Sequence, residues 1–407
     1  MLARNDDEEI LVHTASRPVA AVEPYQWRPP AELPRRRWLY GRHLIRAAVS
    51  ATAAPPGLGK SSLSIAEALA MVTGRALLGE RPAEPLRVLV ANLEDPLEEV
   101  ERRIAAACLH YGIGEEDIGD RLFLVSESNE PIVIAEQSRD GPIITTGSTI
   151  LEQIIRDNFI DVAIFDPFVS LHRVAENDNM ATDMVVKELS RIARSADCAI
   201  EIVHHTRKLN NVEASIDAVR GGSAIIGAVR SARVLTRMTA EESEKFGVQE
   251  HWRHFRVADG KANFSPPADR STWFRLASID LGNHGPDGEP SDLVGVTERW
   301  VPPSPLDGLD VSDLARVQER IAGGEFRKSD QSPEWVGCAV ADVLGLDAEN
   351  PADRSRIKSL LNTWTANGVL KTVHRPDKNR QTRPFVVVGE RVFASSAAPQ
   401  HQEVEQW

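Results

Sequence analysis

Four segments in the first half of the chain have the hydrophobic pattern of buried strands. Each is a short apolar run without regular polar alternation, which is typical of strands with both faces covered. They cover residues 47–54, 86–92, 161–166 and 198–205. Stretches with apolar residues at helical spacing lie between them, at residues 61–72, 97–111 and 181–197. Strands that alternate with helices need crossover connections, so the pattern predicts an α/β fold with a mostly parallel sheet.

Shorter patterns predict further elements of the same domain. Residues 122–125 predict a strand, residues 131–146 a β-hairpin around Asp140-Gly141, and residues 149–159 a helix. A polar loop at residues 207–217 follows the fourth buried run and is long enough to be functional. The α/β domain is expected to cover residues 35–280.

The C-terminal part of the chain has a different organisation. Glycines and prolines predict a linker over residues 281–308. Beyond it come three helical patterns and two strand patterns, at residues 311–322, 334–344, 351–366, 369–373 and 384–388. Three helices and a hairpin are the outline of a winged helix, a variant of the helix-turn-helix. A small winged-helix-like domain is therefore expected over residues 309–395.

The two ends of the chain are expected to lie outside both domains. Residues 1–34 are acidic and then rich in proline, which indicates a poorly ordered arm. Residues 396–407 are expected to form a disordered tail. Three arginines then precede Trp38-Leu39-Tyr40. This stretch could lead a short strand pair into the core, or be a solvated charge run beside packed aromatic residues.

The first buried run leads into Ala54-Pro55-Pro56-Gly57-Leu58-Gly59-Lys60-Ser61, and a predicted helix follows. A strand, a glycine-rich loop and a helix beginning with Lys-Ser are the context of a phosphate-binding loop. Backbone amides at the helix N-terminus would bind phosphate, the lysine would reach the β- and γ-phosphates, and the serine hydroxyl would bind Mg²⁺. The expected nucleotide-binding residues are Gly57, Leu58, Gly59, Lys60, Ser61 and Ser62.

This loop departs from the usual G-x-x-x-x-G-K-[ST] pattern at two positions. Ala54 stands where the first glycine is usual, and Pro56 lacks an N–H that could face the ligand. The alternative is a turn and a helix that contain this sequence without binding phosphate. The flanking strand and helix favour the phosphate-binding loop.

Two acidic positions follow buried strands at the edge of the sheet where the loop is expected. Glu94 and Asp95 come after the second strand, and Asp166 ends the third. Ligands of open α/β sheets bind at the carboxyl ends of the strands. Glu94 is therefore the candidate base for an attacking water, and Asp166 the candidate ligand of Mg²⁺ together with Ser61. The alternative is that Asp95 caps the next helix while Glu94 is merely solvated.

The fourth strand ends in His204-His205. A neutral imidazole N–H can donate a hydrogen bond to a γ-phosphate and so sense its loss. A phosphate sensor is favoured over a zinc site because no third ligand is placed nearby. Later cations, Arg233 and Arg237 among them, are expected to be idle for their own nucleotide, and for any one of them a surface charge is the alternative.

The overall composition limits the class of protein. The chain has 407 residues, 42% of them hydrophobic, and a net charge of −13, which argues against general nucleic-acid affinity but not against a local basic patch. Three distant cysteines indicate neither a disulfide framework nor a zinc site. Without a secretory signal or a sufficiently long apolar run, the protein is expected to be cytoplasmic.

From Trp38 to about Leu276, the motifs APPGLGKSS, VLVANLEDP, VAIFDPF, EIVHHTRK, RGGSAIIGAVR and GKANF occur in this order. Together they resemble the RepA-type hexameric replicative helicases of broad-host-range plasmids, within the RecA/DnaB-like P-loop (AAA family) ATPases. The resemblance implies a RecA-like core that uses ATP and Mg²⁺, and a homo-oligomer, with a hexameric ring as the expected form, acting on single-stranded DNA. It implies Glu94 as catalytic base, His204 as sensor with His205 as the alternative, and Arg230 as arginine finger with help from Lys261.

A local basic excess marks the C-terminal domain. Residues 354–383 contain eight basic residues and one acidic residue, a net charge of +7. This charge is expected to meet DNA phosphates on the recognition helix and the wing tip, although winged helices also dock proteins. The resemblance gives no support for this module. The expected DNA contacts are Arg354, Arg356, Lys358, Arg375, Lys378, Arg380 and Arg383.

Three functions fit the sequence. The first is a DNA-directed ATPase of the replicative-helicase class. The second is an ATP-gated regulator whose winged helix binds DNA without unwinding it. The third is a RecA-like accessory ATPase with the same site and different partners.

Overall fold

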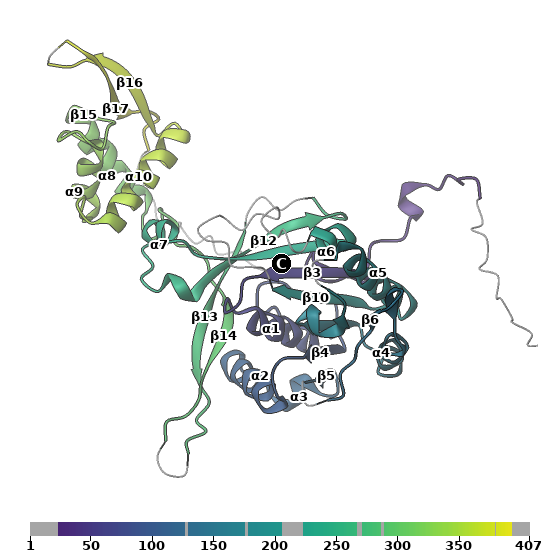
Figure 1. Ribbon diagram of the computed structural model, residues 1–407. Coiled ribbons are helices and arrows are strands. Elements are labelled where there is room, and N and C mark those ends of the chain that lie inside the picture. The colour runs from purple at the N-terminus through teal and green to yellow at the C-terminus, as the bar shows by residue number, and fades with distance from the viewer. Residues whose placement is uncertain are drawn as a thin grey trace, which may run out of the picture. The chain divides into compact units, whose positions relative to one another are not determined.

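Residues 38–299 are built around a nine-stranded sheet in the computed structural model (Figure 1). The order across the sheet is β14-β13-β12-β11-β3-β10-β8-β4-β5. The strands are β3 (Ala48–Ala54), β4 (Val88–Asn92), β5 (Leu122–Val125), β8 (Val162–Asp166), β10 (Ala199–His205), β11 (Ser231–Arg237), β12 (His254–Ala262), β13 (Thr272–Asp280) and β14 (Leu293–Arg299). Neighbours from β11 to β5 are parallel, whereas β12, β13 and β14 are added antiparallel. The expected α/β class with a mostly parallel sheet is confirmed.

The structure describes residues 23–126, 129–175, 178–205, 223–266, 271–285, 289–378 and 380–392. It divides into two units, residues 1–37 and 38–407. In the first, the described residues contain the 3-10 turn η1 (Pro30–Glu32). The expectations for most of the N-terminal arm, for the loop at 207–217, for Arg220-Gly221-Gly222 and for the C-terminal tail lie outside the described residues. No described helix is long and apolar enough to cross a membrane.

Helices cover both faces of the parallel part of the sheet (Figure 1). On one face lie α1 (Lys60–Thr73), α2 (Leu97–Tyr111) and α3 (Glu115–Ile118), and on the other α4 (Thr146–Asp157), α5 (Asn179–Ser195) and α6 (Ser223–Ala228). Alternate strand residues serve the two faces. Val90 and Ile164 pack in the core with α1, whereas Ala91 and Phe165 pack in the core with α4 and α5. Helix α4 begins earlier than expected because the Thr145 hydroxyl caps it by accepting from the Gly147 amide.

Several small elements complete residues 38–299. The strand pair β1 (Trp38–Tyr40) and β2 (Leu44–Ile45) confirms the expected lead into the core. The hairpin of β6 (Ala135–Ser138) and β7 (Gly141–Ile144) is also as expected, and β9 (His172–Arg173) joins it. The remaining elements are η2 (Phe168–Leu171), α7 (Ala240–Phe246) and η4 (His251–Arg253).

The linker expected over residues 281–308 was placed too early. Its middle part is β14, which pairs along its whole length with β13 and forms one edge of the large sheet. The edge groups of β14 are occupied by helix side chains. The Ser62 hydroxyl accepts from the Thr297 amide at 2.7 Å and donates to the Gly295 carbonyl at 3.0 Å, and the Tyr111 hydroxyl donates to the Thr297 carbonyl at 2.6 Å. These contacts attach β14 to α1 and α2.

The C-terminal elements follow the expected order, with one addition. They are α8 (Val311–Ala322), β15 (Phe326–Arg327), α9 (Val336–Leu344), α10 (Pro351–Ala366), β16 (Leu370–Pro376) and β17 (Thr382–Val388). The short strand β15 was not expected, and it makes the hairpin a three-stranded sheet of order β15-β17-β16. The three helices and this sheet enclose a core that includes Val317, Ile357, Trp364, Leu370 and Val386.

Candidate functional site

The predicted phosphate-binding loop connects β3 to α1. Gly57 has φ +71° and Gly59 has φ +89°, a left-handed backbone that favours glycine. Gly59 is also the N-cap of α1, so the helix begins at Lys60. Ala54 is fully buried at the end of β3 and packs with Leu58. An alanine is tolerated there because the chain is still an extended strand at this point.

The residues expected to bind Mg²⁺ lie together. The Ser61 hydroxyl, in the first turn of α1, donates a hydrogen bond of 2.7 Å to Oδ2 of Asp166 at the end of β8. Asp166 is buried. A hydroxyl and a carboxylate are the hard oxygen ligands that Mg²⁺ prefers, and the fit to a divalent cation is therefore good.

Lys60 lies in the same place, almost completely buried. Its Nζ is 3.3 Å from Nδ1 of His205. Burial lowers the pKa of Lys60 below its ordinary value, and the carboxylates of Asp166 and Glu94 oppose this shift. An anionic ligand would supply the charge that this buried ammonium needs.

Residue alternation explains which histidine reaches the site. In β10, His205 is on the face that carries Val203 and packs with α1, and His204 is on the face that carries Ile202 and packs with α5. The structure therefore places His205, the alternative sensor, against Lys60. The Nε2 atom of His205 is buried and has no hydrogen-bond partner among the described residues. It lies 3.8 Å from Oε2 of Glu94.

Glu94 lies on a short turn that Asn92 holds in place. The side-chain oxygen of Asn92 accepts from the amides of Glu94 and Asp95, at 3.2 and 3.0 Å, and its amide donates to Asp95 at 3.0 Å. Asn92 is buried at the end of β4, in register with Asp166. The Glu94 carboxylate itself is 55% exposed, which leaves it accessible to water.

The alternative in which Asp95 caps the following helix is wrong. The N-cap of α2 is Pro96, which makes no side-chain cap. Asp95 instead accepts a hydrogen bond of 2.7 Å from Arg103, which also binds Glu99 at 3.0 Å. Asn92, Asp95 and Arg103 thus brace the turn that carries Glu94, and sequence analysis missed Asn92 and Arg103. The Asn-x-x-Asp spacing of an Asx turn was the available signal.

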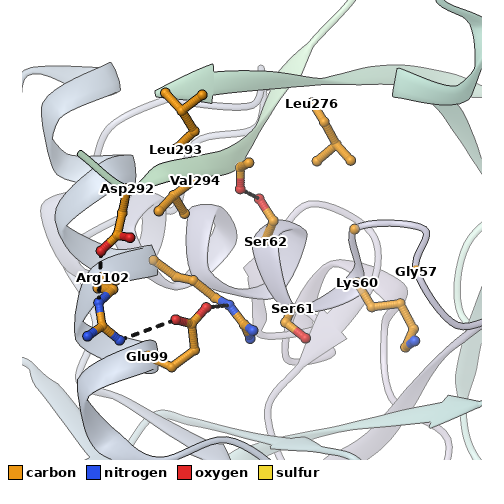
Figure 2. A pocket seen from close by; sticks show the side chains of 13 residues that line it. Gly57, Lys60, Ser61, Ser62, Glu99, Arg102, Leu276, Asp292, Leu293 and Val294 are labelled. Carbon is orange, nitrogen blue, oxygen red and sulfur yellow. Dashed lines mark hydrogen bonds and ion pairs between the residues drawn. The ribbon is translucent and has the colours of Figure 1, made fainter. Parts of the chain in front are cut away.

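A pocket of about 460 Å³ continues from the loop along the start of α1 (Figure 2). One wall is α2, with Arg102 and Arg103, and the opposite wall is the β13–β14 hairpin, with Leu276 and Val294. The Ser62 side chain was expected to contribute to nucleotide binding. Its hydroxyl instead holds β14 at the rim of this pocket.

Arg230 lies at the opposite edge of the sheet from the loop. It directly precedes β11, and its amide donates to the Val49 carbonyl at 3.0 Å, near the start of β3. Its side chain is exposed. Lys261 donates to the carbonyls of Ile226 and Gly227, at 2.8 and 2.7 Å, and holds the end of α6 beside Arg230. Burial and the charge of Arg230 lower the pKa of Lys261.

The other two arginines of β11 correct the sequence analysis. Arg233 is buried and forms a two-pronged ion pair with Glu67 of α1, with both N···O distances 2.5 Å, so it is not a surface charge. Arg237 donates to the Gly57 carbonyl at 3.0 Å. It therefore contacts the loop of its own chain and is not idle there, because β11 runs parallel to β3 and ends at the same edge of the sheet.

The basic set of the C-terminal domain is divided in two. Arg354 and Lys358 on α10 approach Asp330, and Arg356 donates to the carbonyls of Pro305 and Asp307. On the hairpin, Lys378 binds Glu334 at 3.1 Å and Arg383 lies 3.7 Å from Asp377. Arg375 and Arg380 are exposed and have no hydrogen-bonded or ionic partner among the described residues.

The sequence also matches known proteins. Residues 19–211 match a family model described as an AAA domain. One solved structure, the ATPase domain of a helicase, is similar over 56% of this chain and 81% of its own chain, at 13% sequence identity and a TM-score of 0.41. The AAA-domain match covers β3 to β10, which carry the loop, Glu94, Asp166 and His205. The chain thus has an α/β P-loop core similar to that of AAA-type, RecA-like ATPases.

Proposed function

We propose that the protein hydrolyses ATP to ADP and phosphate at the carboxyl edge of its sheet. The observation that carries the proposal is the convergence of Lys60, Ser61 and Asp166 with Glu94 and His205. These residues come from four segments far apart in sequence, yet contacts of 2.7 to 3.8 Å link them. A buried lysine and a buried imidazole nitrogen beside a glycine loop fit a bound phosphate chain.

Each residue has a role that follows from its place. The loop amides and Lys60 bind the phosphates, and Ser61 and Asp166 hold Mg²⁺, which neutralises developing charge. Glu94 accepts the proton of the attacking water while the bond between the γ-phosphorus and the bridging oxygen breaks. His205 can donate a hydrogen bond to the γ-phosphate, and we now propose it as the sensor in place of His204.

The nucleoside would extend into the pocket beside Ser62. Its apolar wall, Leu276 and Val294, suits a base, and Arg102 lies where polar groups of the ligand would pass (Figure 2). Arg102 is held by Asp292 at 3.3 Å and by Glu99 at 3.5 Å, so its guanidinium is oriented before a ligand enters.

We propose that Arg230 completes the site of a neighbouring copy. It lies at the opposite edge of the sheet from its own loop, so it is suited to reach a nucleotide on another copy rather than its own. A homo-oligomer, of which a hexameric ring is the form implied by the resemblance, would place it there. Single-stranded DNA along such a ring remains part of this proposal.

The C-terminal element order supports a winged-helix-like domain that contacts DNA. The first proposed function is therefore a DNA-directed ATPase motor of the helicase class. A regulator that binds duplex DNA and uses ATP only for assembly is the second candidate, which the exposed Arg375 and Arg380 favour equally.

Turnover of ATP with Mg²⁺, measured with and without single-stranded DNA over a range of protein concentrations, tests this function. Specific activity that rises with protein concentration supports an interfacial site, and stimulation by DNA supports a motor. Unwinding of a forked duplex separates the motor from the regulator. Absence of turnover under all these conditions would refute the proposal.

A further inference from the structure

The three-stranded sheet of the C-terminal domain has one face toward the helices and one away from them. Leu370, Val386 and Val388 belong to the core with α8, α9 and α10. Strand alternation therefore places Lys371 and Arg375 of β16 on the outer face. Arg383 of β17 is on the same face, because it pairs directly with Arg375.

The outer face is rich in cations. Arg375 and Arg383 lie opposite each other in the hairpin, and like charges in this position destabilise a strand pair. Their nearest acid is Asp377, whose side chain is 9% exposed and is shared with Arg327 at 3.1 Å. Lys371 and Arg375 are exposed and have no hydrogen-bonded or ionic partner in the described part of the chain. An external anion would relieve this repulsion.

The cations of α10, in contrast, are used inside the domain. Arg354 stacks on Trp335 at 4.6 Å and donates to the Asp330 carbonyl at 2.6 Å. Lys358 binds the Asp330 carboxylate at 2.6 Å, and Arg356 is held by two backbone carbonyls. Little of the expected basic surface of the recognition helix is therefore available to a partner.

The hairpin extends beyond the part of the sheet that is supported on both sides. β15 pairs only with Phe385 and Val386, so the end that carries Arg375 and Arg383 is a two-stranded ribbon (Figure 1). A two-stranded ribbon fits the major groove of a duplex, and the phosphates on either side supply dense negative charge.

We infer that the outer face of the β16–β17 hairpin binds the phosphodiester backbone of a duplex nucleic acid, and that α10 does not read its bases. The inference deepens the proposed DNA-directed function and rests on it for the partner. It predicts binding that depends strongly on salt and little on sequence, because phosphates carry no sequence information.

The test uses the full chain and a fluorescent, blunt-ended DNA duplex of mixed sequence, with duplex RNA of equal length as a second probe. The variant Lys371→Gln with Arg375→Gln removes two exposed cations of the hairpin. The control, Arg320→Gln with Lys358→Gln, removes two exposed cations from α8 and α10 of the same domain. Affinity is measured between about 50 and 200 mM salt.

The hairpin variant should bind more weakly at every salt concentration, with a slope of log affinity against log salt that is smaller by about 2. The control should keep the slope of the wild type. Loss confined to the DNA arm assigns the site to DNA, and loss in both arms assigns it to either duplex. Equal slopes for the hairpin variant and the wild type, equal losses in both variants, or no duplex binding by the wild type would overturn the inference.

ATP turnover without nucleic acid, measured on the same samples, separates this inference from the proposed function. Lys371 and Arg375 lie in the C-terminal domain, so turnover should be unchanged in the hairpin variant. Normal duplex binding without turnover would contradict the ATPase and leave the hairpin interface intact.

Discussion

The Ser61 hydroxyl donates a 2.7 Å hydrogen bond to the Asp166 carboxylate, although the two residues lie on different elements and far apart in sequence. One begins the helix after the glycine loop, and the other ends a buried strand two positions along the sheet. Both oxygens are suited to Mg²⁺, which would replace the proton that they share. This contact connects the phosphate-binding loop to the acidic residues of the neighbouring strands.

Asp166→Asn should weaken metal binding. An amide oxygen carries no full charge, so the Mg²⁺ concentration that gives half-maximal ATP turnover should rise by about tenfold or more. Asp120→Asn is a matched control, because its carboxylate is 81% exposed. An unchanged Mg²⁺ dependence in Asp166→Asn, with turnover retained, would show that this carboxylate does not bind the metal.

Asn92 is expected to act as a positioning residue for Glu94. Asn92→Ala removes the acceptor for the Glu94 and Asp95 amides, so the base loses its alignment while nucleotide binding remains. kcat should fall by up to about 100-fold with little change in KM. Asn92→Asp keeps the acceptor and should recover part of the loss.

Glu94→Gln provides the reference for that variant. Loss of a general base costs about 10² to 10⁴ in rate, and the glutamine should leave nucleotide affinity near that of the wild type. If Asn92→Ala raises KM and leaves kcat unchanged, the Asn92 brace does not serve the chemical step.

Arg230 is expected to act on the site of a neighbouring copy. Arg230→Ala should keep nucleotide binding and lose about a thousandfold or more in turnover. Mixing this variant with Lys60→Ala should restore activity, because some interfaces then combine an intact loop with an intact arginine. Two inactive variants that stay inactive when mixed, despite forming mixed oligomers, would argue against a shared site.

Glu67 and Arg233 connect α1 to β11 inside the protein, and Arg233 also donates to Thr52 at 2.7 Å. Arg233→Met leaves the Glu67 carboxylate buried and unpaired, which should lower the free energy of unfolding by about 3 to 5 kcal/mol. The double variant Arg233→Met with Glu67→Leu removes both charges and should lose clearly less. Urea denaturation of the wild type and both variants measures the difference; equal losses would contradict the buried pair.

Lys60 gives the nucleotide affinity a defined pH dependence. Burial lowers the pKa of Lys60, so its positive charge, and the affinity for phosphate, should be lost at a lower pH than for an ordinary lysine as pH rises. Glu94 raises the pKa of Lys60, so Glu94→Gln should move this loss to still lower pH. Binding of a fluorescent ADP analogue against pH measures both. Lys60→Arg stays charged and should show no such loss.

Local patterns were sufficient to predict the parallel strands, the loop and the C-terminal helices. Strand alternation would also have distinguished the two histidines, because His205 shares a face with Val203 and the buried loop lysine lies there. β14 could not be predicted in this way. Its residues lie between glycine- and proline-rich segments, and it is defined by pairing with β13 and by its contacts with Ser62 and Tyr111.

The cations show a second limit of the sequence. Arg233, Arg237 and Arg354 look alike as exposed charges in a chain, and only tertiary contacts show that one is buried, one holds the loop and one stacks on Trp335. Side-chain partners distant in sequence decide these roles.

Phosphate release from ATP with Mg²⁺, compared between the wild type and Lys60→Ala at equal concentration and equal thermal stability, tests the central claim most directly. Lys60 is the buried cation of the proposed site, so the wild type should turn over and the variant should lose nearly all activity and nucleotide affinity. Equal turnover in both proteins, or a wild type that takes up no ATP with Mg²⁺, would contradict the nucleotide site.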